Sequence, residues 1–106
     1  MAGIRRSLIK EGLAHDRIIR SMPNLAAKIS QGMTVWIAGD KVQTADRMMA
    51  KMIFQSFGRE FEVSEEDRLD AATAVSGSGP AYVYYLAEAL MEAATDLHFT
   101  SEEALK

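Results

Sequence analysis

The chain lacks cysteine, contains only two prolines and has a single tryptophan among its 106 residues. Without cysteine it forms no disulfide, no zinc–thiolate site and no thiol nucleophile, which agrees with a cytoplasmic location. It also lacks a long apolar run, since the longest, Ala81 to Ala87, falls far short of the roughly 18 to 20 residues of a membrane span. The first ten residues have no apolar core, so we expect no signal peptide.

An excess of basic charge is missing as well. The 12 lysines and arginines are outnumbered by 15 aspartates and glutamates, which gives a net charge of −3. A dedicated nucleic-acid binder usually carries a basic surplus, so we expect no nucleic-acid partner. With 48% hydrophobic and 25% charged residues, the composition excludes a disordered or fibrous chain and suits one domain or part of a larger one.

Up to about residue 63 the sequence predicts helices and strands in alternation. Residues 33–38 are β-branched and aromatic and apolar on both faces, which is typical of a covered strand. Pro23 cannot donate to a strand ladder, so we expect the strand before it to end there. The expected elements are a helix at 4–11 ended by Gly12, strands at 17–20 and 33–38, a helix at 43–57 capped by Gly58, and a strand at 60–63.

From Ser64 onward we expect only helices. Ser64 and Asp67 have the spacing of a capping box, followed by a helix up to a turn at 76–79. Pro80 is expected at the first position of a long helix that ends near Leu97, and Ser101 at the start of one more. We therefore expect two domains, 1–63 and 64–106.

The long helix is apolar around most of its circumference. Only Glu88, Glu92, Thr95 and Asp96 give it a polar stripe. Such a helix must be buried on two sides, and residues 64–106 are too few to cover it. The cover must come from a second chain or from further segments of the protein.

Two segments could carry chemistry. In Ser76–Pro80, two glycines allow close approach to another surface, and the free amides of Ala81 and Tyr82 could hold an anion; the alternative is a plain turn between helices. Met22, Pro23 and Asn24 follow a strand, at the edge where α/β sheets bind ligands. The Asn24 amide suits a ribose hydroxyl or another amide, and the alternative is an ordinary turn.

The remaining candidates have simpler explanations, and none predicts a metal site. We expect the two histidines on the surface, the acidic cluster to stabilise a helix N-terminus, the basic cluster to face solvent, the methionines to fill a core or interface, and the tryptophan to pack in its strand. These residues are His15 and His98; Glu65, Glu66 and Asp67; Arg5, Arg6 and Lys10; Met48, Met49 and Met52; and Trp36.

Taken together, the segments Ile19–Asn24 and Leu69–Tyr82 resemble pyrroline-5-carboxylate reductase. The second segment contains Thr-Ala-Val-Ser-Gly-Ser-Gly-Pro-Ala-Tyr, which is similar to that family's signature, and the resemblance extends over essentially the whole chain. It implies an α+β fold, in which the tail of a Rossmann-type NAD(P)H-binding domain (1–63) precedes the start of an all-helical dimerisation domain (64–106). The implied activity is hydride transfer from NADPH or NADH to the imine carbon of pyrroline-5-carboxylate, giving L-proline.

The resemblance also assigns residues. It implies that Met22, Pro23 and Asn24 line the nicotinamide end of the cofactor site, and that a homodimer forms through residues 80–97. It further implies a wall of the substrate pocket made by Thr73, Ser76, Gly77 and Ser78.

The sequence departs from the family pattern in ways that affect activity. The glycine-rich turn and the Ser-Pro-Gly-Gly-Thr substrate loop are absent from these residues, Leu25-Ala26 replaces Thr-Pro, and Leu97-His98-Phe99 replaces Gly-Leu. We therefore expect this polypeptide to be inactive alone and name no catalytic residue. Two alternatives are a non-enzymatic oligomerisation or regulatory module and a related reductase acting on another imine or acid.

Overall fold

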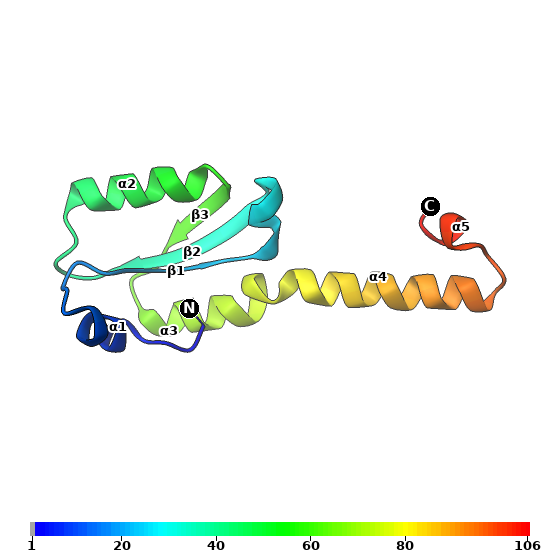
Figure 1. The fold of residues 1–106 in the computed structure, drawn as a ribbon, viewed down its shortest axis with the longest axis horizontal. Helices are drawn as coiled ribbons and strands as arrows, with labels where there is room; N and C mark the ends of the chain where they lie inside the picture. Colours follow the sequence, from blue (N-terminus) through cyan, green and yellow to red (C-terminus); the bar gives the residue numbers. More distant parts are fainter. Residues whose placement is uncertain (1) are drawn as a thin grey trace.

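A computed structural model describes residues 2–106, and it shows a small α/β body with a helical arm (Figure 1). The principal extents are 60 × 24 × 21 Å and the radius of gyration is 18.4 Å. A compact chain of this length would have a radius of about 13 Å. The arm accounts for the difference, since it projects from the body along the longest axis (Figure 1).

The body contains a mixed three-stranded sheet in the order β1-β2-β3. The strands are β1 (Ile19–Pro23), β2 (Gly32–Ala38) and β3 (Gly58–Glu62). β1 runs antiparallel to β2, with Pro23 opposite Thr34, and is joined to it by the short 3₁₀ helix η1 (Leu25–Ile29). β3 runs parallel to β2, with Gly32 opposite Gly58. The C-terminal end of β1 therefore lies at the edge where β2 and β3 begin.

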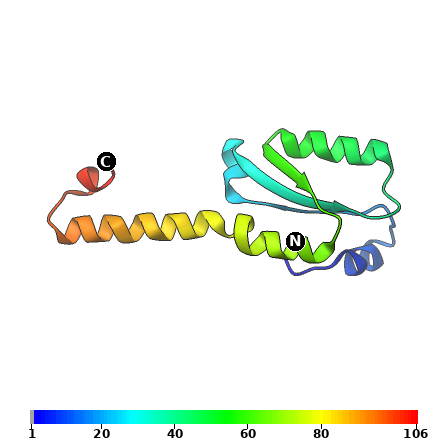
Figure 2. The same cartoon turned by 180° about the vertical axis from the view of Figure 1, so that it is seen from behind.

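Helices cover both faces of the central strand, as the sequence predicts for residues 33–38. On one face Val35 and Ile37 form a core with Val63 and with Leu69 of α3 (Glu66–Ala72). On the other face Trp36 packs with Val42 and with Phe54 of α2 (Thr44–Gln55). α1 (Arg6–Leu13) lies on the same side of the sheet as α3 (Figures 1 and 2).

Several predicted boundaries are wrong, and at Gly58 the reason is a tertiary neighbour. Gly58 does not cap a helix but begins β3, with φ = +146° beside Gly32. Ser64 is not the N-cap of α3, since Glu65 takes that position. α1 continues through Gly12, and Ala14 supplies the left-handed end.

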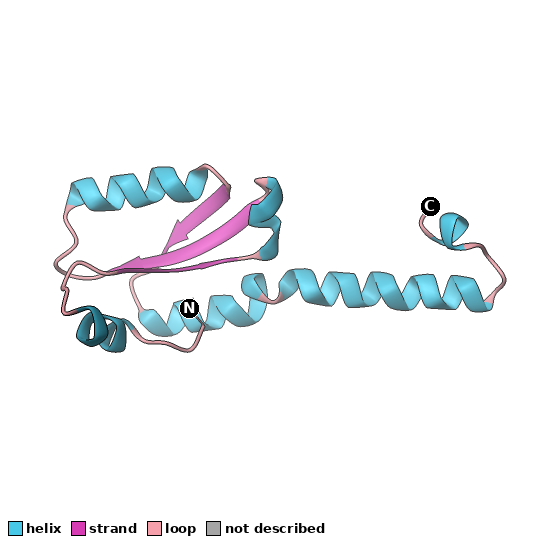
Figure 3. Cartoon of the chain, viewed as in Figure 1, coloured by secondary structure: helices cyan, strands magenta, loops and turns pink. Residues whose placement is uncertain are grey.

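The predicted turn at 76–79 is instead part of a nearly continuous helix (Figure 3). α3 passes into the π-helical turn η2 (Thr73–Gly77), and α4 (Gly79–Asp96) follows. Pro80 is therefore the second residue of α4 rather than the first. The last helix, α5 (Ser101–Ala104), is confirmed, but Thr100 caps it through a capping box with Glu103.

The arm is exposed along most of its length in the single chain. None of the residues of α4 is buried, and Val83, Leu86 and Leu90 each remain more than 60% exposed. No helix within residues 2–106 is both long and apolar enough to cross a bilayer. The methionines Met48, Met49 and Met52 are also exposed, so they do not fill the core of this chain, and their place in an interface stays a prediction.

The half-buried carboxylate of Glu60 makes the body sensitive to acid. The Trp36 indole donates a 2.7 Å hydrogen bond to Glu60, and this bond, helped by Lys51 and opposed by burial, lowers the pKa of Glu60. A lowered pKa stabilises the fold above about pH 4.3, the ordinary glutamate value, and this contribution is lost as the pH falls through the lower folded value. Urea unfolding followed by Trp36 fluorescence should show this loss.

The variant Glu60→Gln should flatten this acid-dependent loss of stability, because it cannot ionise. The control Glu62→Gln leaves the Trp36–Glu60 hydrogen bond intact and should retain the loss. Equal acid sensitivity of the wild-type chain and Glu60→Gln would contradict the assignment.

Candidate functional site

The C-terminal end of β1 meets the π-helical turn η2, so the structure brings together the two segments singled out in the sequence. The Met22 methyl carbon lies 3.4 Å from where a Cβ on Gly77 would sit, and Thr73 Cγ2 lies 3.7 Å from the same point. In Figure 1 this contact region is the right-hand end of the sheet, above the junction of α3 and α4. Residues 55 positions apart in sequence thus form one surface.

The backbone and the side chain of Asn24 each form a hydrogen bond with the backbone of Met33. Its amide N–H donates to the Met33 carbonyl oxygen at 3.2 Å, and its side-chain Oδ1 accepts from the Met33 N–H at 3.1 Å. Because the side-chain oxygen is engaged, the group that Asn24 can offer a ligand is its NH2 donor. Pro23 lies beside it as the exposed last residue of β1.

The hydroxyls of the Ser-Gly-Ser segment are turned back on their own helix. Thr73 donates to Leu69 O at 3.1 Å, Ser76 to Ala72 O at 3.1 Å, and Ser78 to Thr73 O at 3.0 Å. With their protons engaged, these three oxygens can only accept a hydrogen bond from a ligand. Such a surface suits an N–H group better than an anion.

Of the two interpretations of this segment, anion binding at the start of α4 is wrong for Ala81. Its N–H donates to the Ser78 carbonyl oxygen at 3.0 Å. Ser78, the residue between η2 and α4, satisfies this amide because its backbone is helical and does not form an open loop. The Tyr82 hydroxyl reaches back to the Ala74 carbonyl oxygen at 3.2 Å and closes the outer side of the turn.

Arg20, which the sequence reasoning missed, anchors this surface. Its side chain is 2% exposed, and it donates to Glu66 Oε1 at 2.9 Å and to Asp70 Oδ1 at 2.6 Å. Burial alone would lower the pKa of Arg20, but the hydrogen bonds and charges of Asp70 and Glu66 outweigh it and raise that pKa. The backbone N–H of Arg6 donates to the same Glu66 oxygen at 2.7 Å.

A signal for Arg20 was present in the sequence. A charged residue within an apolar strand, two positions before Met22, lies on the same face of that strand. A buried arginine needs acidic partners, and Glu66 and Asp70, four apart on one helix face, supply them. The acidic first turn of α3 therefore does more than stabilise the helix N-terminus.

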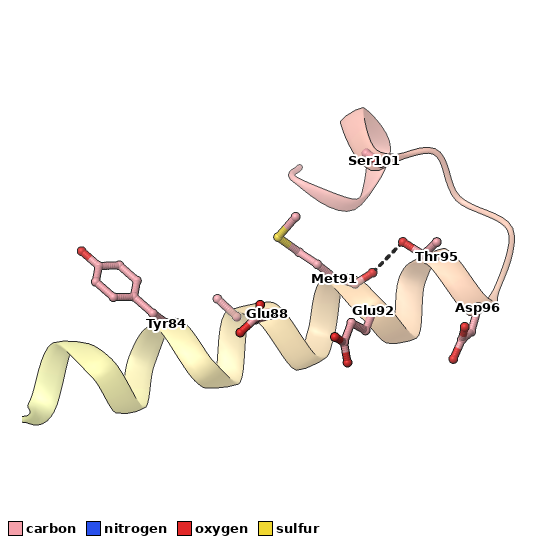
Figure 4. A pocket seen from close by; sticks show the side chains of 8 residues that line it. Tyr84, Glu88, Met91, Glu92, Thr95, Asp96 and Ser101 are labelled. Atoms are coloured by element: carbon pink, nitrogen blue, oxygen red, sulfur yellow. Dashed lines mark hydrogen bonds between the residues drawn. The ribbon is translucent and has the colours of Figure 1, made fainter.

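A groove on the arm lies away from these residues. It has a volume of about 790 Å³ between α4 and α5 and is lined by acidic and apolar side chains such as Glu88, Met91 and Glu92 (Figure 4). It contains none of the predicted site residues. Both histidines are exposed, as expected, and residues 2–106 contain no cluster of three potential metal ligands.

Comparison with known proteins supplies the deciding observation. The family model described as pyrroline-5-carboxylate reductase dimerisation matches residues 66–106. The curated pyrroline-5-carboxylate reductase of Synechocystis sp. is 42% identical over 92 residues, which are 87% of this chain and 34% of that protein. The Thermus thermophilus reductase is 36% identical over 107 residues, 100% of this chain and 41% of that protein.

The chain belongs to the pyrroline-5-carboxylate reductase family. Solved reductase structures agree: that from Coxiella burnetii gives a TM-score of 0.82 at 38% identity, over 97% of this chain and 38% of that one. The structure from Plasmodium falciparum, with NADP bound, gives a TM-score of 0.89 at 30% identity, over 97% of this chain and 42% of that one. The chain therefore spans between about a third and two fifths of the length of these relatives. The expected α+β fold with a helical dimerisation part is confirmed.

Proposed function

We propose that this chain forms part of an NAD(P)H-dependent reductase that converts 1-pyrroline-5-carboxylate to L-proline in proline biosynthesis. The contact of Met22 with Gly77 carries the proposal, because it joins the segments that resemble the family's cofactor and substrate motifs. We place the nicotinamide end of the cofactor against Met22, Pro23 and Asn24. A cytoplasmic location agrees with the absence of cysteine and stays a prediction.

The residues fit both reactants. Met22 and Pro23 offer apolar surface to a nicotinamide ring, and the Asn24 NH2 can donate to its carboxamide or to a ribose hydroxyl. When bound, the cofactor supplies the hydride. Gly77 and the oxygens of Thr73, Ser76 and Ser78 form the substrate wall, and these oxygens can accept from a protonated ring nitrogen. The protein's contribution is to orient the two reactants.

We further propose that residues 1–63 and 64–106 are parts of two domains and that residues 80–97 pair with a second copy. The exposed apolar face of α4 and the match to a dimerisation family support this arrangement. The alternative, a non-enzymatic oligomerisation module, would need the same pairing but no cofactor contact at Asn24. A different imine or acid substrate is a third possibility that substrate profiling separates.

A chimera tests the proposed function. The matching stretch of the Synechocystis reductase, which is 42% identical, is replaced by this chain's residues. We expect turnover of pyrroline-5-carboxylate within about tenfold of the parent, a change of about 1.4 kcal/mol in the barrier, because this chain retains both segments that resemble the family's motifs. A folded, dimeric chimera that binds NADPH but does not reduce the imine would contradict the proposal and favour the non-enzymatic module.

Within that chimera, Asn24→Asp should lower kcat/KM for pyrroline-5-carboxylate by about 10- to 100-fold, the effect of losing one buried hydrogen-bond donor. The aspartate can still accept from the Met33 N–H, so the fold is retained while the ligand donor is lost. Gln31→Glu adds the same charge at an exposed position nearby and should leave kcat/KM unchanged. Equal kinetics for both variants would contradict the role of Asn24.

The 106-residue polypeptide alone should show no appreciable reductase activity. Its residues contain neither the glycine-rich phosphate turn nor the later substrate loop of the family, and a hydride-transfer enzyme works by orienting both reactants. Oxidation of NADPH in the presence of pyrroline-5-carboxylate, followed by absorbance, measures this. Turnover near that of a full-length reductase would overturn the expectation.

A further inference from the structure

β1 and the continuous helix α3–η2 face each other through two separate contacts. Arg20 and Met22 are two positions apart in β1, so their side chains lie on the same face of the strand. Arg20 binds Glu66 and Asp70, while Met22 packs against Gly77 about two turns further along. An ionic contact at one end and an apolar contact at the other thus relate the same two elements.

The two contacts differ in how far they tolerate a shift of the helix α3–η2 along β1. The Met22 side chain is flexible and adapts to its surroundings, and Leu69 packs on Val35 and Ile37 through non-directional contacts. The Arg20 guanidinium is a rigid fork, and hydrogen bonds of 2.9 and 2.6 Å to two carboxylates are lost if the helix shifts by one residue, about 1.5 Å. Arg20 is therefore the contact that defines the register.

We propose that Arg20 is a positioning residue: by bridging Glu66 and Asp70 it sets the register of α3–η2 on β1, so that Met22 seats against Gly77 and the cofactor segment faces the substrate wall. Its importance for catalysis rests on the proposed function, whereas the geometric part does not. Apolar residues of similar size could hold the two elements together equally well, but without fixing one register.

The Met22 methyl group reports the register directly. Nuclear magnetic resonance of a chain with isotope-labelled methionine methyls should show a nuclear Overhauser contact between this methyl and the α protons of Gly77, since the two groups are adjacent. Arg20→Met removes both hydrogen bonds, and this contact should be lost. Arg20→Lys reaches only one carboxylate at a time and should restore the contact in part.

Asp70→Ala provides a variant that tests the register with little risk to the fold. The Asp70 side chain is 41% exposed, and alanine is the best helix former. It should weaken the Met22–Gly77 contact and shift the Met22 methyl resonance. Asp67→Ala is the matched control, because Asp67 lies on the same helix, is 81% exposed and pairs with Arg5 on the solvent side. It should change neither signal.

If Arg20 only stabilised the fold, the result would differ. The substitutions of Arg20 and Asp70 would then lower Tm but leave the Met22 methyl signal and its contact with Gly77 unchanged in the folded variants. That result would overturn the proposal. If Arg20→Met does not fold, as judged by Trp36 fluorescence, Asp70→Ala decides alone. The measurement needs neither cofactor nor substrate, so its failure leaves the proposed function standing, and an inactive chimera leaves the role of Arg20 in the register standing.

Discussion

Gly58→Ala should destabilise the chain by more than about 3 kcal/mol, a large part of the stability of a small domain. A Cβ at this position would lie 2.1 Å from the Gly32 carbonyl oxygen and 2.5 Å from the Gly32 nitrogen. Backbone atoms in a parallel strand pair cannot move aside, and φ = +146° is strained for any residue with a side chain. Urea unfolding followed by Trp36 fluorescence measures the loss.

Gly12→Ala is the matched control for this substitution. Gly12 lies within α1, and a Cβ there meets no atom within 4 Å. We expect a gain of about 0.5–1 kcal/mol, because alanine favours a helix over glycine. If Gly58→Ala were within 1 kcal/mol of the wild-type chain, the close approach of β3 to Gly32 would be wrong.

The double variant Leu86→Glu, Leu90→Glu should abolish self-association of the chain. Both leucines are more than 60% exposed in the single chain, so the change does not disturb the body. In a paired helix it would bury two carboxylates without partners, at several kcal/mol each, so the dissociation constant should rise by at least about 100-fold. Size-exclusion chromatography over a concentration series measures the change.

The control for these leucines lies on the polar stripe of the same helix. Glu88→Gln and Glu92→Gln keep the size of each side chain and leave the apolar face of α4 untouched. The chain with these changes should associate as the wild-type chain does. Equal association of the leucine variant would show that α4 does not pair through this face.

The sequence predicts the elements well where the local pattern is strong. The run 33–38 is apolar on both faces because two helices cover β2. The apolar circumference of α4 predicts burial on two sides, whereas the single chain leaves this helix exposed, so the cover by a second chain or by further segments stays a prediction. Gly58 shows the limit, because a glycine after a helix suggests a cap by local rules. Its actual cause is Gly32, a residue 26 positions away across a strand pair.

The candidate site also divides into what local patterns predict and what tertiary contacts decide. The motifs at Met22–Asn24 and Thr73–Ser78 can be recognised from residue type and order. Their contact, the engaged Asn24 oxygen and the inward-turned hydroxyls depend on how β1 and η2 lie, which no local pattern contains. A charged residue in the strand indicates that Arg20 needs acidic partners, but the local pattern does not identify Glu66 and Asp70, which lie 46 and 50 residues away.

Sedimentation equilibrium of the unaltered 106-residue chain tests the central claim most directly, namely that α4 is one half of an interface with a second copy. The extended arm, with no buried residue in α4, predicts a dimer at micromolar concentration. A single species of about 11.7 kDa that stays monomeric and folded across the concentration range would contradict the claim. A mass of about twice that value, lost in the Leu86→Glu, Leu90→Glu variant, is the result that we expect.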